Sequence, residues 1–170
     1  IGLMLMILGK QFYGVDKIII VEPSESRRDM ALDLGADIVI DPTVQDPVAM
    51  VMNTTDNQGA QAIFTACPVI ETHKQAFKMV AKRGVVNFFG GVPKDEPEIS
   101  LLSNFIHYRE AYITGSHGST PEQHKTALNL IANKSVDISS LVSESVPLSD
   151  IMRGFELAAS GKLAKVMVTP

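Results

Sequence analysis

The chain has 170 residues, 45% of them apolar and 20% charged, which indicates a single globular domain. Its net charge of −4 and its lack of a basic stripe argue against nucleic acid or an anionic membrane as a partner. The single cysteine, Cys67, excludes an internal disulfide and favours a reducing, cytoplasmic setting, and no apolar run reaches the roughly 18 residues that a membrane span needs.

The first third of the chain alternates between strands and helices. Residues 18–21 form a continuous β-branched run, as expected for a strand that is buried on both faces. A helix is predicted from Ser24 to Leu34, with Gly35 at its end, and Ile38–Ile40 is the next short strand. Asp46-Pro47 then predicts a helix start, with aspartate as the cap and proline in the first turn.

The middle of the chain repeats this alternation. Ala62–Thr65 is a predicted strand, and Ile70–Ala81 is the helix that follows it. Lys82-Arg83-Gly84 has the composition of a helix C-terminus, because basic residues favour the negative end of the helix dipole and glycine favours the stop. A strand over Val85–Phe89 then ends in Gly90-Gly91.

The last third contains five further predicted elements. Leu101–His107 is a short helix, and Tyr112–Thr114 is a strand. Thr120 and Gln123 form a capping-box pair that opens a helix reaching Ala132. A final helix is expected to be capped at Ser149 and to stop at Gly161, and a strand over Lys165–Val168 follows.

Strand–helix alternation at these intervals predicts an α/β fold with a doubly wound parallel sheet of the Rossmann type. Such sheets bind ligands in the crevice at the carboxyl ends of their strands. Glu22, Cys67, Gly90 and Gly115 each lie at or just past a predicted strand end, so we expect function there.

The spacing of Gly2 and Glu22 suggests a dinucleotide as the ligand. Dinucleotide-binding folds place an acidic residue on the ribose about 20 residues after a glycine-rich turn, and Gly2 fits the last glycine of that turn. The alternative is a glycine that opens a helix and a solvated glutamate. The earlier glycines and the first, central strand are not in the sequence, so we expect the polypeptide to continue upstream of Ile1.

An acidic residue at position 22 also discriminates between coenzymes. A carboxylate repels a 2′-phosphate, so Glu22 favours NAD over NADP. Arg27 or Arg28 would argue for NADP if its guanidinium paired with that phosphate, and both also fit exposed positions on the helix.

Four segments together resemble the coenzyme domain of medium-chain, zinc-type alcohol and polyol dehydrogenases. Their order and spacing agree with the family, and the resemblance covers the whole chain. They are Ile1-Gly2-Leu3-Met4, Val21-Glu22-Pro23, Leu34-Gly35-Ala36-Asp37 and Gly161-Lys162-Leu163-Ala164-Lys165-Val166. Gly90-Gly91-Val92-Pro93 and the loop over residues 115–119 look closest to the sorbitol and threonine dehydrogenase branch.

The resemblance implies a mechanism and a set of site residues. In the family, zinc lowers the pKa of the bound alcohol and hydride passes to the nicotinamide, with zinc ligands from a preceding domain. This chain is therefore expected to hold coenzyme residues but neither catalytic residues nor metal ligands. Those coenzyme residues are Ile1 and Gly2 by the pyrophosphate, Glu22 and Arg27 by the adenosine ribose, Cys67 and Gly90 in the crevice wall, Gly91, Val92, Thr114 and Gly115 by the nicotinamide, and Lys165 reaching the pyrophosphate.

The resemblance also implies an organisation and an assembly. Residues 1–140 are expected to form the NAD-binding domain, and residues 141–170 the segment that returns to the catalytic domain. The strand at Tyr112–Thr114 would pair with its copy in a homodimer or within a tetramer. The substrate would be a small-molecule alcohol or polyol.

Two other functions stay open on the sequence. A methyltransferase that uses S-adenosylmethionine also holds a ribose with an acidic residue at this place, and a non-enzymatic NAD-sensing module would bind the same coenzyme. The histidines do not show the spacing of zinc ligands. His73 and His124 are expected on exposed helix faces, His107 in packing or a partner contact, and His117 near the nicotinamide end. Cys67 is expected to be a small wall residue rather than a nucleophile.

Overall fold

A computed structural model describes all residues, 1–170, and divides them into two compact units. The first unit contains residues 1–2 and 40–119, and the second contains residues 3–39 and 120–170. Each is described by itself below. No helix in either unit is both long enough and apolar enough to cross a membrane.

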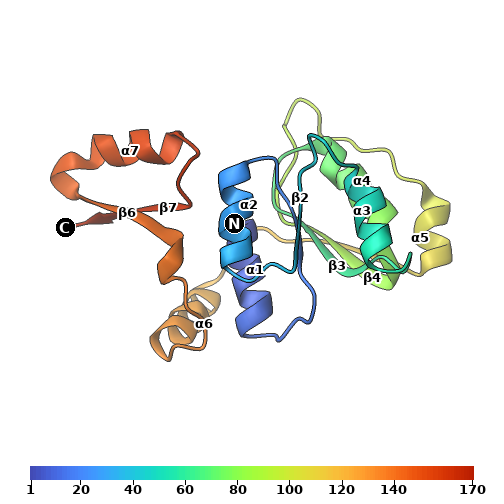
Figure 1. Ribbon diagram of the computed structural model, residues 1–170, viewed down its shortest axis with the longest axis horizontal. Coiled ribbons are helices and arrows are strands. Elements are labelled where there is room, and N and C mark those ends of the chain that lie inside the picture. The colour runs from blue at the N-terminus through green and yellow to red at the C-terminus, as the bar shows by residue number, and fades with distance from the viewer. The chain divides into compact units, whose positions relative to one another are not determined.

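The first unit is built on a three-stranded parallel sheet in the order β3-β4-β5. Helices α3 and α4 lie side by side along β3 and β4, and α5 lies beside β4 (Figure 1). The elements are α3 (Pro47–Thr54), β3 (Ala60–Thr65), α4 (Ile70–Met79), β4 (Val80–Phe88), α5 (Ser103–Arg109) and β5 (Tyr112–Gly115).

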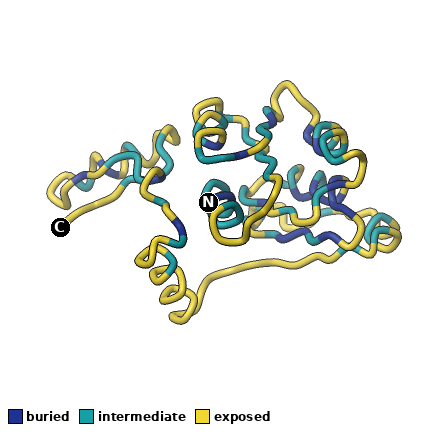
Figure 2. The backbone as a smooth tube through the Cα atoms, turned by 60° about the horizontal axis from the view of Figure 1, so that its bottom comes forward, coloured by how far each residue is buried: buried dark blue, intermediate teal, exposed yellow.

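The core of the first unit lies between the sheet and α4. Ala76 and Phe77 of α4 pack with Val80 and Val86 of β4, all of them buried. Buried positions therefore gather on β4 and the facing side of α4, whereas β5 and the segment after it are exposed (Figure 2). The predicted start of α3 is confirmed, because the carboxylate of Asp46 accepts hydrogen bonds from the N–H groups of Val48 and Ala49.

The predicted boundary between α4 and β4 is wrong. The helix ends at Met79, and Lys82-Arg83-Gly84 lies inside a strand rather than at a helix C-terminus. The cause is pairing with β3: Ala60 is opposite Val80 and Ala62 is opposite Val85, so the intervening residues bulge out of the ladder. Arg83 takes a positive φ of 59° in this bulge.

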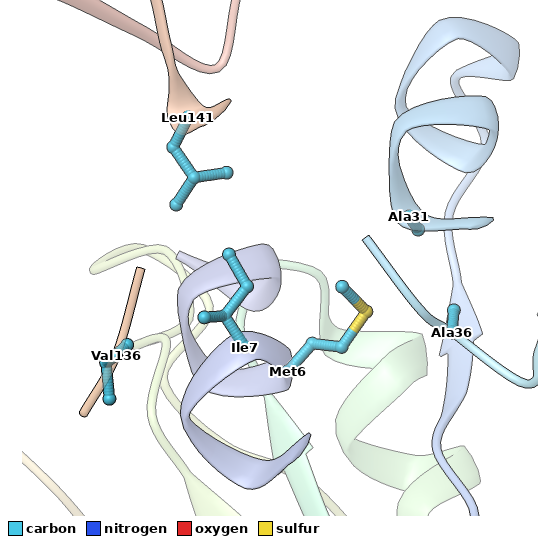
Figure 3. Close-up of a cluster of buried hydrophobic side chains, with 6 residues drawn as sticks. All are labelled: Met6, Ile7, Ala31, Ala36, Val136 and Leu141. Atoms are coloured by element: carbon cyan, nitrogen blue, oxygen red, sulfur yellow. The ribbon is translucent and has the colours of Figure 1, made fainter. Parts of the chain in front are cut away.

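The second unit holds the N-terminal helix and the first strand pair. Its elements here are α1 (Gly2–Gln11), β1 (Ile19–Val21), α2 (Glu25–Asp33) and β2 (Ile38–Ile40), with β1 and β2 paired. The first residue of α1 and the last residue of β2 belong to the other unit. Figure 3 shows Met6 of α1 pointing toward Ala31 and Ala36, while Ile7 points toward Val136 and Leu141. These six residues form a buried apolar cluster that joins α1 to α2 and to the C-terminal segment.

The C-terminal part of the second unit consists of α6 and a β-α-β motif. Helix α7 lies along the parallel pair β6-β7 (Figure 1). The elements are α6 (Pro121–Ala132), the 3₁₀ turn Ser139–Leu141, β6 (Val142–Pro147), the 3₁₀ turn Leu148–Asp150, α7 (Ile151–Ala159) and β7 (Lys165–Thr169).

Two predictions are confirmed here, one is wrong, and one strand was missed. The capping box of Thr120 and Gln123 is present in both directions. Strand β6 was not predicted, because its sequence Val-Ser-Glu-Ser-Val-Pro alternates polar and apolar residues only briefly. The residue before α7 is Asp150 rather than Ser149, because a 3₁₀ turn precedes the helix. The predicted α/β class with parallel strands is confirmed.

Candidate functional site

The carboxyl ends of β3, β4 and β5 are joined to one another by backbone hydrogen bonds in the first unit. Thr65 is in register with Phe88, and Phe88 is in register with Gly115. Beyond these positions the N–H of Gly90 donates to the carbonyl oxygen of Thr65 at 2.6 Å, and the N–H of Ser116 donates to that of Phe88 at 3.1 Å. The structure therefore brings Cys67, Gly90 and Gly115 to one edge of the sheet, as predicted.

Gly90 and Gly91 have different surroundings at this edge. A Cβ on Gly90 would lie 2.8 Å from the carbonyl oxygen and 2.9 Å from the nitrogen of Cys67. The backbone that follows β4 therefore packs directly against the backbone that follows β3. A Cβ on Gly91 would meet nothing within 4 Å. Gly91 is exposed and Val92 is half-buried, so this part of the loop borders open space.

The β5 exit is held by a side-chain hydrogen bond as well. Asn87 Nδ2 donates to Ser116 Oγ at 2.9 Å, one residue past Gly115. Thr114 and Gly115 are exposed. No role for Asn87 or Ser116 was predicted from the sequence. An asparagine within the apolar run Val85–Phe89 could have indicated this contact, because a buried amide needs a hydrogen-bonding partner.

Gly2 approaches the exit of β3 in the same unit. A Cβ on Gly2 would lie 3.9 Å from the Cβ of Ala66, which precedes Cys67. Gly2 therefore lies at the first residue of α1 next to the β3 exit, and the exposed Ile1 precedes it. A helix N-terminus beside a strand end is the place where a dinucleotide fold receives a pyrophosphate.

The predicted exposure of His73 is wrong. The exposed fraction of His73 is 3%, because His73, Ala76 and Phe77 lie on one face of α4 and this face packs on the sheet. The sequence could have indicated this burial, because apolar residues follow His73 three and four positions later. The imidazole stacks on Phe88 with ring centroids 4.5 Å apart, and burial lowers its pKa, which backbone hydrogen bonds at Cys67 and Gly90 partly oppose.

In the second unit, Glu22 directly follows β1. Glu22 Oε1 accepts a hydrogen bond from the N–H of Ser24 at 2.9 Å, which fixes the carboxylate at the strand end. Arg28 Nη1 donates to the carbonyl oxygens of Glu22 at 3.0 Å and Pro23 at 2.7 Å. Arg28 thus supports the loop backbone around Glu22.

Arg27 contacts the turn that precedes the strand of Lys165, and both residues belong to the second unit. Arg27 Nη2 donates to the carbonyl oxygen of Gly161 at 3.0 Å, in the turn that leads from α7 to β7. Lys165 is the exposed first residue of β7, opposite Val142 of β6. Arg27 therefore stabilises this turn, and Lys165 is the first residue of the strand that follows it.

The remaining candidates do not gather into a metal site. No group of three or more histidine, cysteine, aspartate or glutamate side chains is placed to hold a metal ion. His107, His117 and His124 are exposed. Cys67 is half-buried, and its Sγ lies 3.4 Å from Thr72 Oγ1, a contact that suits a wall residue.

Comparison with known proteins gives consistent matches. Residues 1–133 match a family model described as zinc-binding dehydrogenase. L-threonine 3-dehydrogenase of Thermococcus kodakarensis is 29% identical over 160 residues, which are 92% of this chain and 45% of that protein. Sorbitol dehydrogenase of Halalkalibacterium halodurans is 26% identical over 170 residues, which are 100% of this chain and 49% of that protein.

A solved structure agrees with these relatives. The crystal structure of 2R,3R-butanediol dehydrogenase from Bacillus subtilis superposes with a TM-score of 0.85 at 26% identity, and the match covers 99% of this chain and 47% of that one. The chain spans about half the length of the curated relatives it matches, at 45% and 49%.

Proposed function

This chain belongs to the zinc-binding dehydrogenase family, and from that premise we propose that it is the coenzyme-binding part of an NAD-dependent oxidoreductase. The reaction is hydride transfer between an alcohol or polyol and nicotinamide. The family resemblance predicted from the sequence is confirmed by the match over residues 1–133.

The observation that carries this proposal is the fixed carboxylate of Glu22. It follows β1 directly, and the hydrogen bond from the N–H of Ser24 uses Oε1, which leaves Oε2 to accept from ribose hydroxyls. A carboxylate held by its own loop needs little reorganisation when a ribose arrives. This favours a ligand that contains a ribose over one that does not.

The glycines of the first unit fit a bound dinucleotide. Gly2 opens α1 beside the β3 exit, where an N-terminal helix end receives phosphate oxygens, and we place Ile1 in the same role. Gly91 has open space at its α-carbon, which permits close approach of a flat ring, and Val92, Thr114 and Gly115 border that ring. Cys67 and Gly90 form the wall, and Arg27 and Lys165 contribute positive charge toward the ribose and pyrophosphate. Bound NAD supplies the carbon that accepts the hydride.

We propose NAD rather than NADP as the coenzyme. The carboxylate of Glu22 would repel a 2′-phosphate. Both nearby arginines are engaged by backbone carbonyls, Arg27 with Gly161 and Arg28 with Glu22 and Pro23. A phosphate would have to compete with those contacts, so the loop is better suited to an unphosphorylated ribose.

Zinc does not fit the residues of this chain. None of its carboxylate, imidazole or thiol groups form a cluster of three or more. No chemical step through zinc follows from these residues. We propose that zinc ligands lie in another region of the protein, and that the residues described here bind and orient the coenzyme.

The organisation of the protein forms part of the same proposal. Residues 1–140 act as the coenzyme domain, and residues 141–170 connect to a catalytic domain. Strand β5 is an edge strand whose four residues are all exposed, which supports pairing with its copy in a homodimer or tetramer. Sedimentation at micromolar concentration tests this assembly, and a monomeric mass would contradict it. We place the protein in the cytoplasm.

The experiment that tests the function compares ligands by thermal stabilisation. NADH should raise the unfolding midpoint of the protein that carries these residues more than NADPH at equal concentration, and S-adenosylmethionine should leave it unchanged. Stabilisation by S-adenosylmethionine would favour a methyltransferase. Stabilisation by NADH, without NAD reduction by any alcohol or polyol, would favour a sensing module.

A further inference from the structure

Asn87 is an unusual residue for the strand that it occupies. It lies in β4 among Val85, Val86 and Phe88, and its exposed fraction is 8%. Its Oδ1 is buried and has no hydrogen-bond partner. An amide buried with one unpaired polar atom is unfavourable, and an aliphatic side chain would satisfy a purely apolar position. The presence of an amide here therefore needs an explanation in the contact that its Nδ2 makes.

The Nδ2 group of Asn87 binds the loop that follows β5. It donates a hydrogen bond to Ser116 Oγ at 2.9 Å. Asn87 is in register with Thr114, and alternate side chains along a strand share a face, so Ser116 comes within reach two residues further on. The N–H of Ser116 also donates to the carbonyl oxygen of Phe88 at 3.1 Å. Ser116 is thus fixed to β4 through both its backbone and its side chain.

These contacts leave the hydroxyl hydrogen of Ser116 available to a ligand. A serine hydroxyl has one hydrogen to donate and two lone pairs that accept. Because Oγ accepts from the amide of Asn87, the O–H bond is directed away from that amide. Ser116 is exposed, and so is Gly115 before it. The first unit therefore presents an oriented hydrogen-bond donor at the carboxyl end of β5.

We propose that Ser116 donates its hydroxyl hydrogen to the carboxamide oxygen of the nicotinamide, and that Asn87 is a positioning residue that directs this hydroxyl. The inference rests on the proposed function, which places the nicotinamide beside Thr114 and Gly115. A hydroxyl whose rotation is already restricted loses less entropy on binding than a free one. The amide of Asn87 should therefore strengthen coenzyme binding without touching the coenzyme.

The test separates the two halves of the coenzyme by comparing NADH with ADP-ribose, which lacks the nicotinamide. Ser116→Ala removes the donor at an exposed position, whereas Ser116→Thr retains a hydroxyl. Asn87→Leu removes the amide and suits the apolar run around it. Ser100→Ala, in the exposed segment before α5, is the matched control. The Kd for each ligand is measured for these four variants and for the double variant that combines Asn87→Leu with Ser116→Ala.

Ser116→Ala should raise the Kd for NADH about tenfold, as expected for the loss of one hydrogen bond, and Asn87→Leu should raise it about fivefold. Ser116→Thr and Ser100→Ala should each bind NADH within about threefold of the unchanged protein. Because Asn87 acts through Ser116, the double variant should bind NADH at most about twofold more weakly than Ser116→Ala alone. The Kd for ADP-ribose should stay within about twofold in every variant.

An unchanged Kd for NADH in Ser116→Ala would overturn the assignment. An equal loss of affinity for NADH and ADP-ribose would also overturn it, because a general structural effect would then explain the loss. Losses that multiply in the double variant would overturn the positioning role of Asn87. If the unchanged protein binds neither ligand, the proposed function fails together with this inference. If it binds both, and Ser116→Ala binds NADH equally well, only this inference fails.

Discussion

Arg27 Nη2 donates a hydrogen bond to the carbonyl oxygen of Gly161 at 3.0 Å, across 134 positions of sequence. The contact joins the first turn of α2 to the turn after α7, where Gly161 takes a positive φ of 70°. A residue proposed to lie beside the ribose is therefore also the one that holds the approach to Lys165. Coenzyme binding and the order of the C-terminal turn should be linked through this side chain.

Replacement of Arg27 by methionine keeps the apolar stem and removes the donor. We expect a loss of about 0.5–1 kcal/mol in the free energy of unfolding, the usual contribution of one hydrogen bond, and faster hydrogen exchange at Lys162 and Leu163. Urea unfolding and exchange mass spectrometry measure both effects. Lys125→Met, which removes a cation from the exposed face of α6, is the control and should change neither. Equal behaviour of the two variants would show that the Gly161 contact contributes nothing.

The two adjacent glycines after β4 offer a matched pair of substitutions. Gly90→Ala would place a methyl group 2.8 Å from the Cys67 carbonyl oxygen, whereas Gly91→Ala would meet nothing within 4 Å. Gly90→Ala should therefore destabilise the protein by about 1–3 kcal/mol, as overpacking against backbone does, and Gly91→Ala by less than about 0.5 kcal/mol. Chemical denaturation measures both stabilities. Gly91→Ala should still weaken NADH binding, because the added methyl group occupies the space proposed for the nicotinamide ring. A reversed order of stability would refute the described packing.

His73 should make stability depend on pH on the acid side of neutrality. Its pKa is lowered below the ordinary value of 6.5 in the folded state, mainly by burial, so the unfolded chain binds the proton more readily. The stabilising contribution is complete above pH 6.5 and is lost as the pH falls below that value toward the folded pKa. The pKa of Asp37 is also lowered, chiefly by the hydrogen bond that it accepts from the Ile18 N–H. The stability that this contributes is lost only as the pH falls below about 3.8, so it does not alter the dependence near pH 6.5.

Urea unfolding at several pH values between about 7.5 and 5.5 measures this dependence. The slope of stability against pH should decrease in His73→Leu and persist in His117→Gln, which alters an exposed histidine. An unchanged slope in His73→Leu would mean that the imidazole titrates alike in the folded and unfolded chains.

Locally encoded features were predictable from the sequence. Asp46 with Pro47, and Thr120 with Gln123, carry their hydrogen-bonding partners within four residues, so short-range chemistry is sufficient. The strand ends that carry Glu22 and Gly90 followed from the alternation of apolar runs. The spacing of Gly2 and Glu22 predicts a dinucleotide as the ligand, and this stays a prediction.

Features that depend on distant pairing were not predictable in the same way. Lys82-Arg83-Gly84 has the local chemistry of a helix stop, yet pairing with Ala60 and Ala62 makes it a bulge in β4. Strand β6 is stabilised by its pairing with β7 rather than by its own mostly polar sequence. The burial of His73 likewise depends on packing against the sheet, where its ring stacks on Phe88 of β4.

The role of Glu22 is tested most directly by titration of NADH and NADPH into the unchanged protein and into Glu22→Ala, with Glu25→Ala as a control at an exposed carboxylate nearby. The unchanged protein should bind NADH more tightly than NADPH. Glu22→Ala should raise the Kd for NADH about 10- to 100-fold, the loss expected for hydrogen bonds to a charged group, and should abolish the preference against NADPH. Equal Kd values for NADH in the unchanged protein and in Glu22→Ala, or a preference for NADPH that persists in both, would contradict the assignment of the ribose to Glu22.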